Sequence, residues 1–82
     1  MNIILYTKTG CPWCDEVRTL FQDKGVVYEE RECRNSKTNF EELVKKSGQT
    51  LTPTLDIDGE IIADSDAVAL TAYFKERGAP GF

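Results

Sequence analysis

The chain has 82 residues, of which 40% are hydrophobic and 29% charged, and its formal net charge is −4; these values are typical of one soluble domain, here residues 1–82. Its ten basic residues are scattered along the chain, which argues against nucleic acid or an anionic membrane as a partner. Only a short apolar run follows Met1, and no apolar stretch approaches the roughly 20 residues of a membrane span, so we expect a cytoplasmic domain without a signal peptide.

A strand and a helix are predicted at the start of the chain. Residues 2–7 hold a short apolar run that ends in a polar loop containing glycine, as in a buried strand. From Pro12 to Lys24 the apolar side chains have the i, i+3, i+4 spacing of one helix face, with Val17, Leu20 and Phe21 on it. Pro12 suits the first position of this helix, and Gly25 suits the residue after its end.

The middle of the chain predicts a second strand and a second helix. The strand opens with Val26-Val27-Tyr28 and becomes polar over residues 29–32. Thr38 and Glu41 have the spacing of a capping box. The helix that follows them has an apolar face and ends near Gly48; the face consists of Phe40, Leu43 and Val44.

The last third of the chain predicts a hairpin and a third helix. Residues 54–57 and 60–63 flank Asp58-Gly59, which is the signature of a tight β-hairpin. Ser65 can cap a helix that runs from Asp66 to Arg77. Residues 79–82 are expected to form a loose tail.

The element order is therefore β-α-β-α-β-β-α, an α/β fold. The first strand-helix-strand unit should be a right-handed crossover between two parallel strands. The last two strands should form an antiparallel hairpin, so that three helices flank a four-stranded mixed sheet.

Cys11 and Cys14, in the segment Cys11-Pro12-Trp13-Cys14, are the strongest chemical signal in the sequence. Cys11 is expected at the start of a helix, where free N–H groups and the helix dipole favour a thiolate, and Lys8 adds a positive charge nearby. Such surroundings lower a thiol pKa to roughly 3.5–7.5. Cys14 lies one helical turn further in, so it can attack a mixed disulfide on Cys11. The pair predicts a thiol–disulfide oxidoreductase.

Other uses of a cysteine pair fit the sequence less well. A closed zinc site needs four ligands, and the chain has no histidine and only one further cysteine, Cys33, so we expect no metal and no tightly bound cofactor. A structural disulfide across so small a ring would remove little unfolded-state entropy. Cys33 is expected to be a side chain at the end of an edge strand without a role, with glutathionylation or intermolecular pairing as the alternative.

Together these segments resemble a glutaredoxin of the dithiol type, a family with the thioredoxin fold. The resemblance covers nearly the whole chain and rests on residues 6–14, on Thr52-Pro53 and on Asp64-Ser65-Asp66. Trp13 stands where the family usually has tyrosine, and it offers an exposed flat surface that can guide a substrate. The resemblance implies that Pro53 is a cis-proline beside the cysteines and that glutathione is the co-substrate.

The resemblance also implies a glutathione site. The backbone of Thr52 would pair with the cysteinyl part of glutathione like an added strand, and Lys8 would meet the glycine carboxylate. The N–H groups at Ser65 and Asp66 would hold the γ-glutamyl carboxylate, and the side chain of Asp66 or Asp64 its ammonium group. The partners implied are glutathione and disulfide-containing or glutathionylated proteins, and the protein is expected to be a monomer.

Some positions depart from the family pattern. Ala63-Asp64 stands where a Gly-Gly pair is common, Leu51-Thr52 where Thr-Val is common, and Ala67 where a second aspartate often occurs. An alternative is therefore a glutaredoxin-like redoxin that is reduced by thioredoxin reductase and supplies an enzyme such as ribonucleotide reductase. A further alternative is an iron–sulfur cluster carrier, which Pro12 disfavours because cluster-binding members usually lack proline there.

Overall fold

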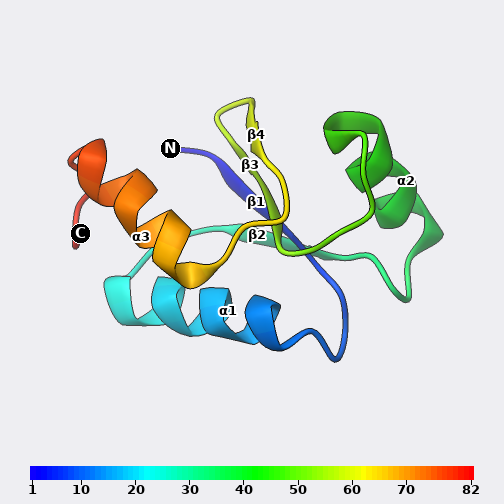
Figure 1. Cartoon of the computed structure of the whole chain (residues 1–82), viewed down its shortest axis with the longest axis horizontal. Coiled ribbons are helices and arrows are strands. Elements are labelled where there is room, and N and C mark those ends of the chain that lie inside the picture. Colours follow the sequence, from blue (N-terminus) through cyan, green and yellow to red (C-terminus); the bar gives the residue numbers. More distant parts are fainter.

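Four strands form the central sheet, in the order β2-β1-β3-β4 (Figure 1). The computed structural model describes residues 1–82, and the strands are β1 (Ile3–Thr7), β2 (Glu29–Glu32), β3 (Thr54–Ile57) and β4 (Glu60–Ile62). β1 runs parallel to β2 and antiparallel to β3, and β4 returns antiparallel beside β3. The predicted four-stranded mixed sheet is confirmed.

Three helices cover the two faces of this sheet: α1 (Pro12–Lys24), α2 (Lys37–Ser47) and α3 (Ala67–Glu76). α1 and α3 lie on one face and α2 lies on the other (Figure 1). The order β-α-β-α-β-β-α and this layering are the thioredoxin-like fold that the sequence predicted. None of the helices is long and apolar enough to cross a membrane.

The sheet divides the apolar interior into two cores, because successive side chains of a strand point to opposite faces. The larger core, on the side of α1 and α3, has eight buried residues: Ile3, Leu5, Val17, Phe21, Leu55, Ile57, Leu70 and Phe74. The smaller core, under α2, consists of Tyr6, Cys33 and Leu43. β1 contributes to both cores, since Leu5 and Tyr6 are each fully buried on opposite faces.

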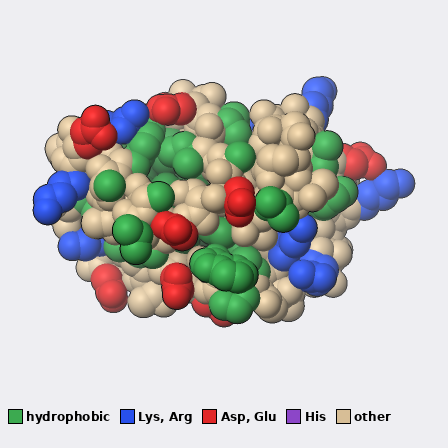
Figure 2. All heavy atoms as spheres, viewed as in Figure 1, with side chains coloured by type: hydrophobic (Ala, Val, Ile, Leu, Met, Phe, Trp, Pro, Cys, Tyr) green, Lys and Arg blue, Asp and Glu red, His purple; other side chains and the backbone are tan.

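Charged side chains are distributed unevenly over the surface. Figure 2 shows Lys and Arg side chains toward the two ends of the visible face, and acidic side chains also across its middle, among hydrophobic ones. The basic residues thus form no broad positive surface on this face, in line with their scattering along the sequence.

α1 begins and ends where the sequence predicts. Pro12 occupies its first turn, and Gly25 follows its last residue with a left-handed φ of 68°. α2 begins one residue after Ser36, whose hydroxyl accepts the N–H of Asn39 at 3.2 Å. The predicted capping role of Thr38 is therefore wrong, because Ser36 has the extended backbone that a cap requires and Thr38 already lies inside the first turn.

α3 is also capped by a different residue from the predicted one. The carboxylate of Asp66 accepts the N–H of Ala69 at 2.8 Å. Ser65, the predicted cap, instead donates its N–H to the carbonyl of Pro53 at 2.8 Å. That contact holds Ser65 beside the segment before β3, so the helix begins one residue later.

The second strand is shorter than predicted. The N–H of Val26 donates to the carbonyl of Phe21 at 2.9 Å and closes the end of α1. The ring of Tyr28 packs on the ring of Phe21, with 5.1 Å between centroids. The predicted strand residues 26–28 therefore lead from the helix back to the sheet, and pairing with β1 begins only at Glu29.

The last residues of the chain pack on α3, so the prediction of a loose tail is wrong. The N–H of Ala79 donates to the carbonyl of Phe74 at 3.0 Å. The ring of Phe82 stacks on that of Phe74, with 4.9 Å between centroids. An aromatic residue near a chain end can thus gain enough contact with the core to order the segment that carries it.

Candidate active site

The loop between β1 and α1 delivers Cys11 to the start of the helix. Gly10 has a left-handed φ of 85°, a conformation that residues with a Cβ atom rarely adopt. Across this turn the N–H of Cys11 donates to the carbonyl of Lys8 at 3.2 Å. Cys11 itself has an extended backbone and is the N-cap of α1, which is the position that the sequence predicted.

Two free thiols lie together at this helix start. The sulfur of Cys11 accepts the backbone N–H of Cys14 at 3.3 Å, and the two Sγ atoms are 2.7 Å apart. Cys14 is fully buried, whereas Cys11 is partly exposed. A molecule that approaches from solvent therefore meets Cys11 first, with Cys14 directly behind it.

The pKa values of the two thiols are shifted in opposite directions. Burial raises the pKa of Cys11, but hydrogen bonds from the side chain and backbone of Cys14 and from the Thr52 hydroxyl outweigh it, so the net pKa is lowered. Burial and the hydrogen bond with Cys11 raise the pKa of Cys14. Because the thiolate is the nucleophilic form, the geometry favours Cys11 as the sulfur that reacts first.

The segment before β3 lies against the Cys11 sulfur. The Thr52–Pro53 peptide bond is cis, as the resemblance implied. The carbonyl oxygen of Thr52 is 3.8 Å and its hydroxyl oxygen 3.7 Å from Cys11 Sγ. Pro53 is buried. The backbone of Thr52 is thereby placed beside the sulfur, where a peptide-like substrate can line up with it.

A cavity of about 320 Å³, which we name the acidic cavity, opens beside this segment. It is lined by Trp13, Leu51, Thr52, Asp64, Ser65 and Asp66. Trp13 and Leu51 are 60% and 53% exposed, and Asp64 has a left-handed φ of 50°. Apart from Lys8 and Pro53, the structure thus brings all the predicted substrate-binding residues to the wall of one cavity.

Lys8 lies in a second cavity, of about 470 Å³, which we name the basic cavity. Its lining is Lys8, Cys33, Arg34, Asn35, Lys37 and Phe40. The ammonium group of Lys8 donates to the carbonyl of Thr50 at 2.6 Å and lies 5.8 Å from the centroid of the Phe40 ring. Apart from Pro53, the predicted glutathione residues therefore divide between an acidic cavity and a basic one.

Cys33 follows β2, where the sequence placed it, but its side chain belongs to the smaller core and is only 3% exposed. Burial, with a further contribution from the carboxylate of Glu32, raises the pKa of the Cys33 thiol to about 11. The thiol is therefore protonated at neutral pH. No three His, Cys, Asp or Glu side chains come together as a group that can hold a metal ion.

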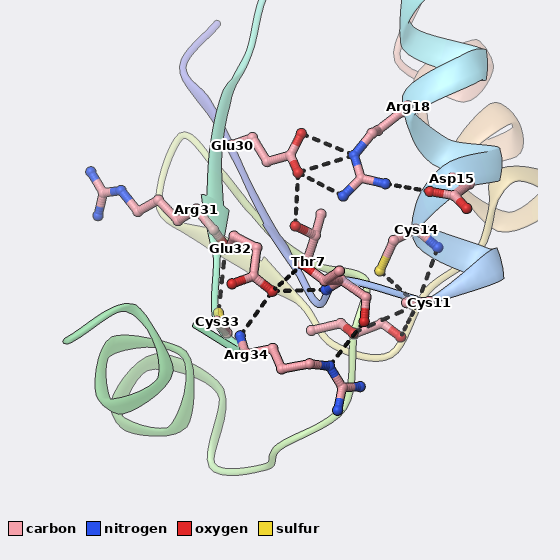
Figure 3. A network of polar contacts seen from close by, with 12 residues as sticks. Thr7, Cys11, Cys14, Asp15, Arg18, Glu30, Arg31, Glu32, Cys33 and Arg34 are labelled. Carbon is pink, nitrogen blue, oxygen red and sulfur yellow. Dashed lines mark hydrogen bonds and ion pairs between the residues drawn. The ribbon is translucent and has the colours of Figure 1, made fainter. Parts of the chain in front are cut away.

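Two carboxylates of β2 connect this strand to the elements around Cys11, and the sequence analysis missed both (Figure 3). Glu30 accepts from the guanidinium of Arg18 on α1 at 2.7 Å and from the hydroxyl of Thr7 at 2.8 Å. Glu32 accepts the N–H of Thr9 at 2.7 Å. The two glutamates point to the same side of the strand because they are two residues apart. This spacing was the feature of the sequence that could have identified them as a pair.

A known protein family matches most of this chain. The family model described as glutaredoxin matches residues 3–62. The chain belongs to the glutaredoxin family. Members of this family are thiol–disulfide oxidoreductases, so the predicted class of enzyme and the predicted fold are both confirmed.

Individual proteins are also similar to this chain. Glutaredoxin 3 of Escherichia coli strain K12 is 35% identical over 65 residues, which cover 79% of this chain and 78% of that protein. The crystal structure of the thioredoxin-like protein BC3987 is 30% identical, with a TM-score of 0.77, and the match covers 85% of this chain and 96% of that one. A buckwheat glutaredoxin–glutathione complex has the same fold, with a TM-score of 0.68 and 23% identity over 93% of this chain and 69% of that one.

Proposed function

We propose that this glutaredoxin is a glutathione-dependent reductase of protein disulfides and of glutathione mixed disulfides. The observation that carries the proposal is the pair of thiols at the start of α1. Cys11 is partly exposed and has a lowered pKa, while Cys14 is buried with its sulfur 2.7 Å away. In this proposal Cys11 is the nucleophile and Cys14 is the resolving cysteine.

Reduction of a disulfide proceeds in two exchanges. The Cys11 thiolate attacks one sulfur of the substrate, the substrate S–S bond breaks, and the departing thiolate takes up a proton. Cys14 then loses its proton and attacks the Cys11 sulfur of the mixed disulfide. The second substrate thiol leaves, and a Cys11–Cys14 disulfide remains. The substrate has gained two electrons from the two cysteines and two protons, one from Cys14 and one from water; the latter balances the proton that Cys11 released when it formed the thiolate.

Two molecules of glutathione restore the dithiol. The first attacks the Cys11 sulfur, so that Cys14 leaves as a thiol and a mixed disulfide with glutathione forms on Cys11. The second attacks the glutathione sulfur of that mixed disulfide and leaves oxidised glutathione and the Cys11 thiolate. A substrate that is already a glutathione mixed disulfide enters directly at this stage, and Cys14 is not needed for it.

The two cavities support glutathione as the co-substrate. The N–H of Ser65, which the resemblance assigned to the γ-glutamyl carboxylate, is already bonded to the carbonyl of Pro53 at 2.8 Å. The N–H of Asp66 at the N-cap of α3 suits that carboxylate, and the side chain of Asp66 suits the γ-glutamyl ammonium group. Lys8 donates one of its three N–H groups to Thr50, which leaves two for a glycine carboxylate. The crystal structure of the buckwheat glutaredoxin, which has the same fold, is that of its complex with glutathione.

The test is the turnover of a small glutathione mixed disulfide, coupled to NADPH through glutathione and glutathione reductase, with Cys11→Ser as the control. We expect turnover that depends on glutathione and is absent in the control. The same substrate is offered in parallel with thioredoxin reductase in place of glutathione. Turnover with neither reductant, in folded protein, would contradict the proposal.

A second candidate is a redoxin that is recharged by thioredoxin reductase. It is favoured by the match to a thioredoxin-like protein at 30% identity and a TM-score of 0.77, and by Asp64, which adds a negative charge to the acidic cavity. Turnover with thioredoxin reductase alone would establish this candidate and would show that the glutathione site has been lost.

A further inference from the structure

Glu32, the last residue of β2, binds two loops through its single carboxylate (Figure 3). One oxygen, Oε2, accepts the N–H of Thr9 at 2.7 Å, the hydroxyl of Thr9 at 3.1 Å and the N–H of Arg34 at 3.0 Å. The other, Oε1, accepts the N–H of Asn35 at 2.7 Å. These bonds lower the pKa of Glu32 to about 2 against the opposing effect of burial, so the carboxylate is ionised at neutral pH.

Every polar group of Thr9 forms a hydrogen bond with Glu32, Arg34 or Asn35. Its N–H and hydroxyl donate to Glu32. Its carbonyl accepts from Arg34 Nε at 2.9 Å, and its hydroxyl oxygen accepts from Asn35 Nδ2 at 3.3 Å. We name the group of Thr9, Glu32, Arg34 and Asn35 the loop clamp. It fixes the loop after β1 to the loop between β2 and α2.

The loop clamp lies next to Cys11 in the chain but does not touch it. The polar contacts of the Cys11 side chain are with Cys14 and Thr52. Thr9 is separated from Cys11 only by Gly10, which has the left-handed φ of 85° that turns the chain into α1. Because glycine is the most permissive residue type, Gly10 does not by itself fix the shape of this turn. The bond from the Cys11 N–H to the Lys8 carbonyl and the fixed position of Thr9 hold it.

We propose that Glu32 is a positioning residue for the nucleophile: by fixing Thr9, it holds Cys11 at the N-cap of α1, where the Cys14 N–H stabilises the thiolate. The inference rests on the proposed role of Cys11 as the attacking sulfur. It extends the site to a residue that contacts neither the sulfur nor the acidic cavity.

Two effects of removing the Glu32 charge have opposite signs, which makes the proposal testable. Loss of a nearby negative charge favours a thiolate and lowers the pKa of Cys11. Loss of the N-cap geometry removes hydrogen bonding to the thiolate and raises that pKa. A role of Glu32 in folding alone would reduce stability and leave the reactivity of Cys11 in the folded protein unchanged.

The experiment uses the whole reduced chain and the variant Glu32→Gln. The rate of alkylation of Cys11 by iodoacetamide is measured against pH, the modified residue is identified by mass spectrometry, and thermal unfolding is recorded in parallel. We expect alkylation at neutral pH to slow by about two- to fivefold, the effect of a lost helix N-terminal interaction. The matched control is Glu29→Gln, because Glu29 lies in the same strand but binds only Arg31, at 2.6 Å; its rate should not change.

Thr9→Ala provides a second variant without a change of charge, for use if Glu32→Gln does not fold. It removes the hydroxyl between Glu32 and Asn35. Slower alkylation of Cys11 in Glu32→Gln, or in Thr9→Ala if Glu32→Gln does not fold, supports the proposal. Unchanged or faster alkylation in that deciding variant overturns it, including the case in which only the unfolding temperature falls. If wild-type alkylation maps to a cysteine other than Cys11, the proposed nucleophile is wrong and this inference falls with it.

Discussion

Thr52 faces the sulfur of Cys11 with two oxygen atoms of opposite effect, its carbonyl at 3.8 Å and its hydroxyl at 3.7 Å. The hydroxyl can donate a hydrogen bond to a thiolate, whereas the carbonyl oxygen can only accept one. The hydroxyl is thus one of the groups that keep the pKa of Cys11 low.

Replacement of Thr52 by Val should therefore raise the pKa of Cys11, because valine keeps the shape of threonine and removes the donor. We expect the midpoint of the Cys11 titration to move to higher pH, measured by the ultraviolet absorbance of the thiolate as a function of pH. Thr71→Val is a control, since the Thr71 hydroxyl bonds within α3 to the Ala67 carbonyl. An unshifted midpoint in Thr52→Val would show that its hydroxyl does not reach the sulfur.

The two active-site cysteines should differ in what their loss removes. Cys11→Ser should abolish all turnover, because no other partly exposed thiol is present. Cys14→Ser should spare the reduction of glutathione mixed disulfides and abolish the reduction of protein disulfides, which needs the resolving attack. Both activities are measured on each variant. Loss of both in a folded Cys14→Ser protein would mean that the roles are assigned wrongly.

Cys33 should make stability depend on pH in the alkaline range. The pKa of its thiol is about 11 in the folded protein, against about 8.5 in an unfolded chain. The unfolded chain therefore loses this proton first, and the free energy of unfolding should fall as the pH rises from about 8.5 toward 11. Urea unfolding at several pH values should show a steeper fall for wild type than for Cys33→Ala. Equal slopes would contradict the raised pKa.

Asp64 should weaken the binding of glutathione. Its carboxylate lies in the acidic cavity with Asp66, where the γ-glutamyl carboxylate is proposed to bind. Asp64→Asn keeps a residue type that tolerates a left-handed backbone and removes one negative charge, so we expect the KM for glutathione to fall by about fivefold at low salt. Asp58→Asn is the matched control, because Asp58 also has a positive φ, of 52°, but lies in the hairpin turn. An equal change in both variants would point to a general charge effect.

The packed C-terminal residues should contribute to stability. Phe82→Ala removes the stacking on Phe74 and should lower the free energy of unfolding by about 1–2 kcal/mol. This corresponds to a fall of roughly 4–8 °C in the unfolding temperature for each kcal/mol in a domain of this size. Val68→Ala, at a side chain that is 81% exposed, should change little. An unchanged unfolding temperature in Phe82→Ala would mean that residues 79–82 form a loose tail, as the sequence predicted.

The parts of the fold that the sequence predicted are those with local signals. α1 has a proline at its start, a glycine at its end and a periodic apolar face, and its bounds match. The cysteine pair was also predictable, because its signal, two cysteines separated by two residues at the start of a helix, is local in the sequence. The caps of α2 and α3 were misplaced, because several residues near each start can cap a helix. At α3, Asp66 rather than Ser65 is the cap, because the N–H of Ser65 bonds to the carbonyl of Pro53, which lies apart from it in the sequence.

The contacts around Cys11 that the sequence did not predict depend on strand register. Thr7 lies opposite Glu32 in the parallel pair of β1 and β2, and this register brings Glu32 to Thr9. No local pattern specifies it, since β2 is a short run of charged residues. The same holds for Lys8, whose position beside Phe40 depends on how α2 packs over the sheet.

The unequal size of the two cores has a consequence for motion. Eight buried residues hold α1 and α3 to the sheet, whereas three lie under α2. Local opening of the α2 layer should therefore cost less free energy than global unfolding, and its amide protons should exchange with solvent before those of β1 and α1. Arg34 and Asn35, which hold Thr9, lie at the entry to this layer. Cys11 is thus carried by α1, in the more stable part of the molecule, and is held in place through Thr9 by residues at the entry to the less stable α2 layer. Mild denaturant should therefore alter the reactivity of Cys11 before the chain unfolds.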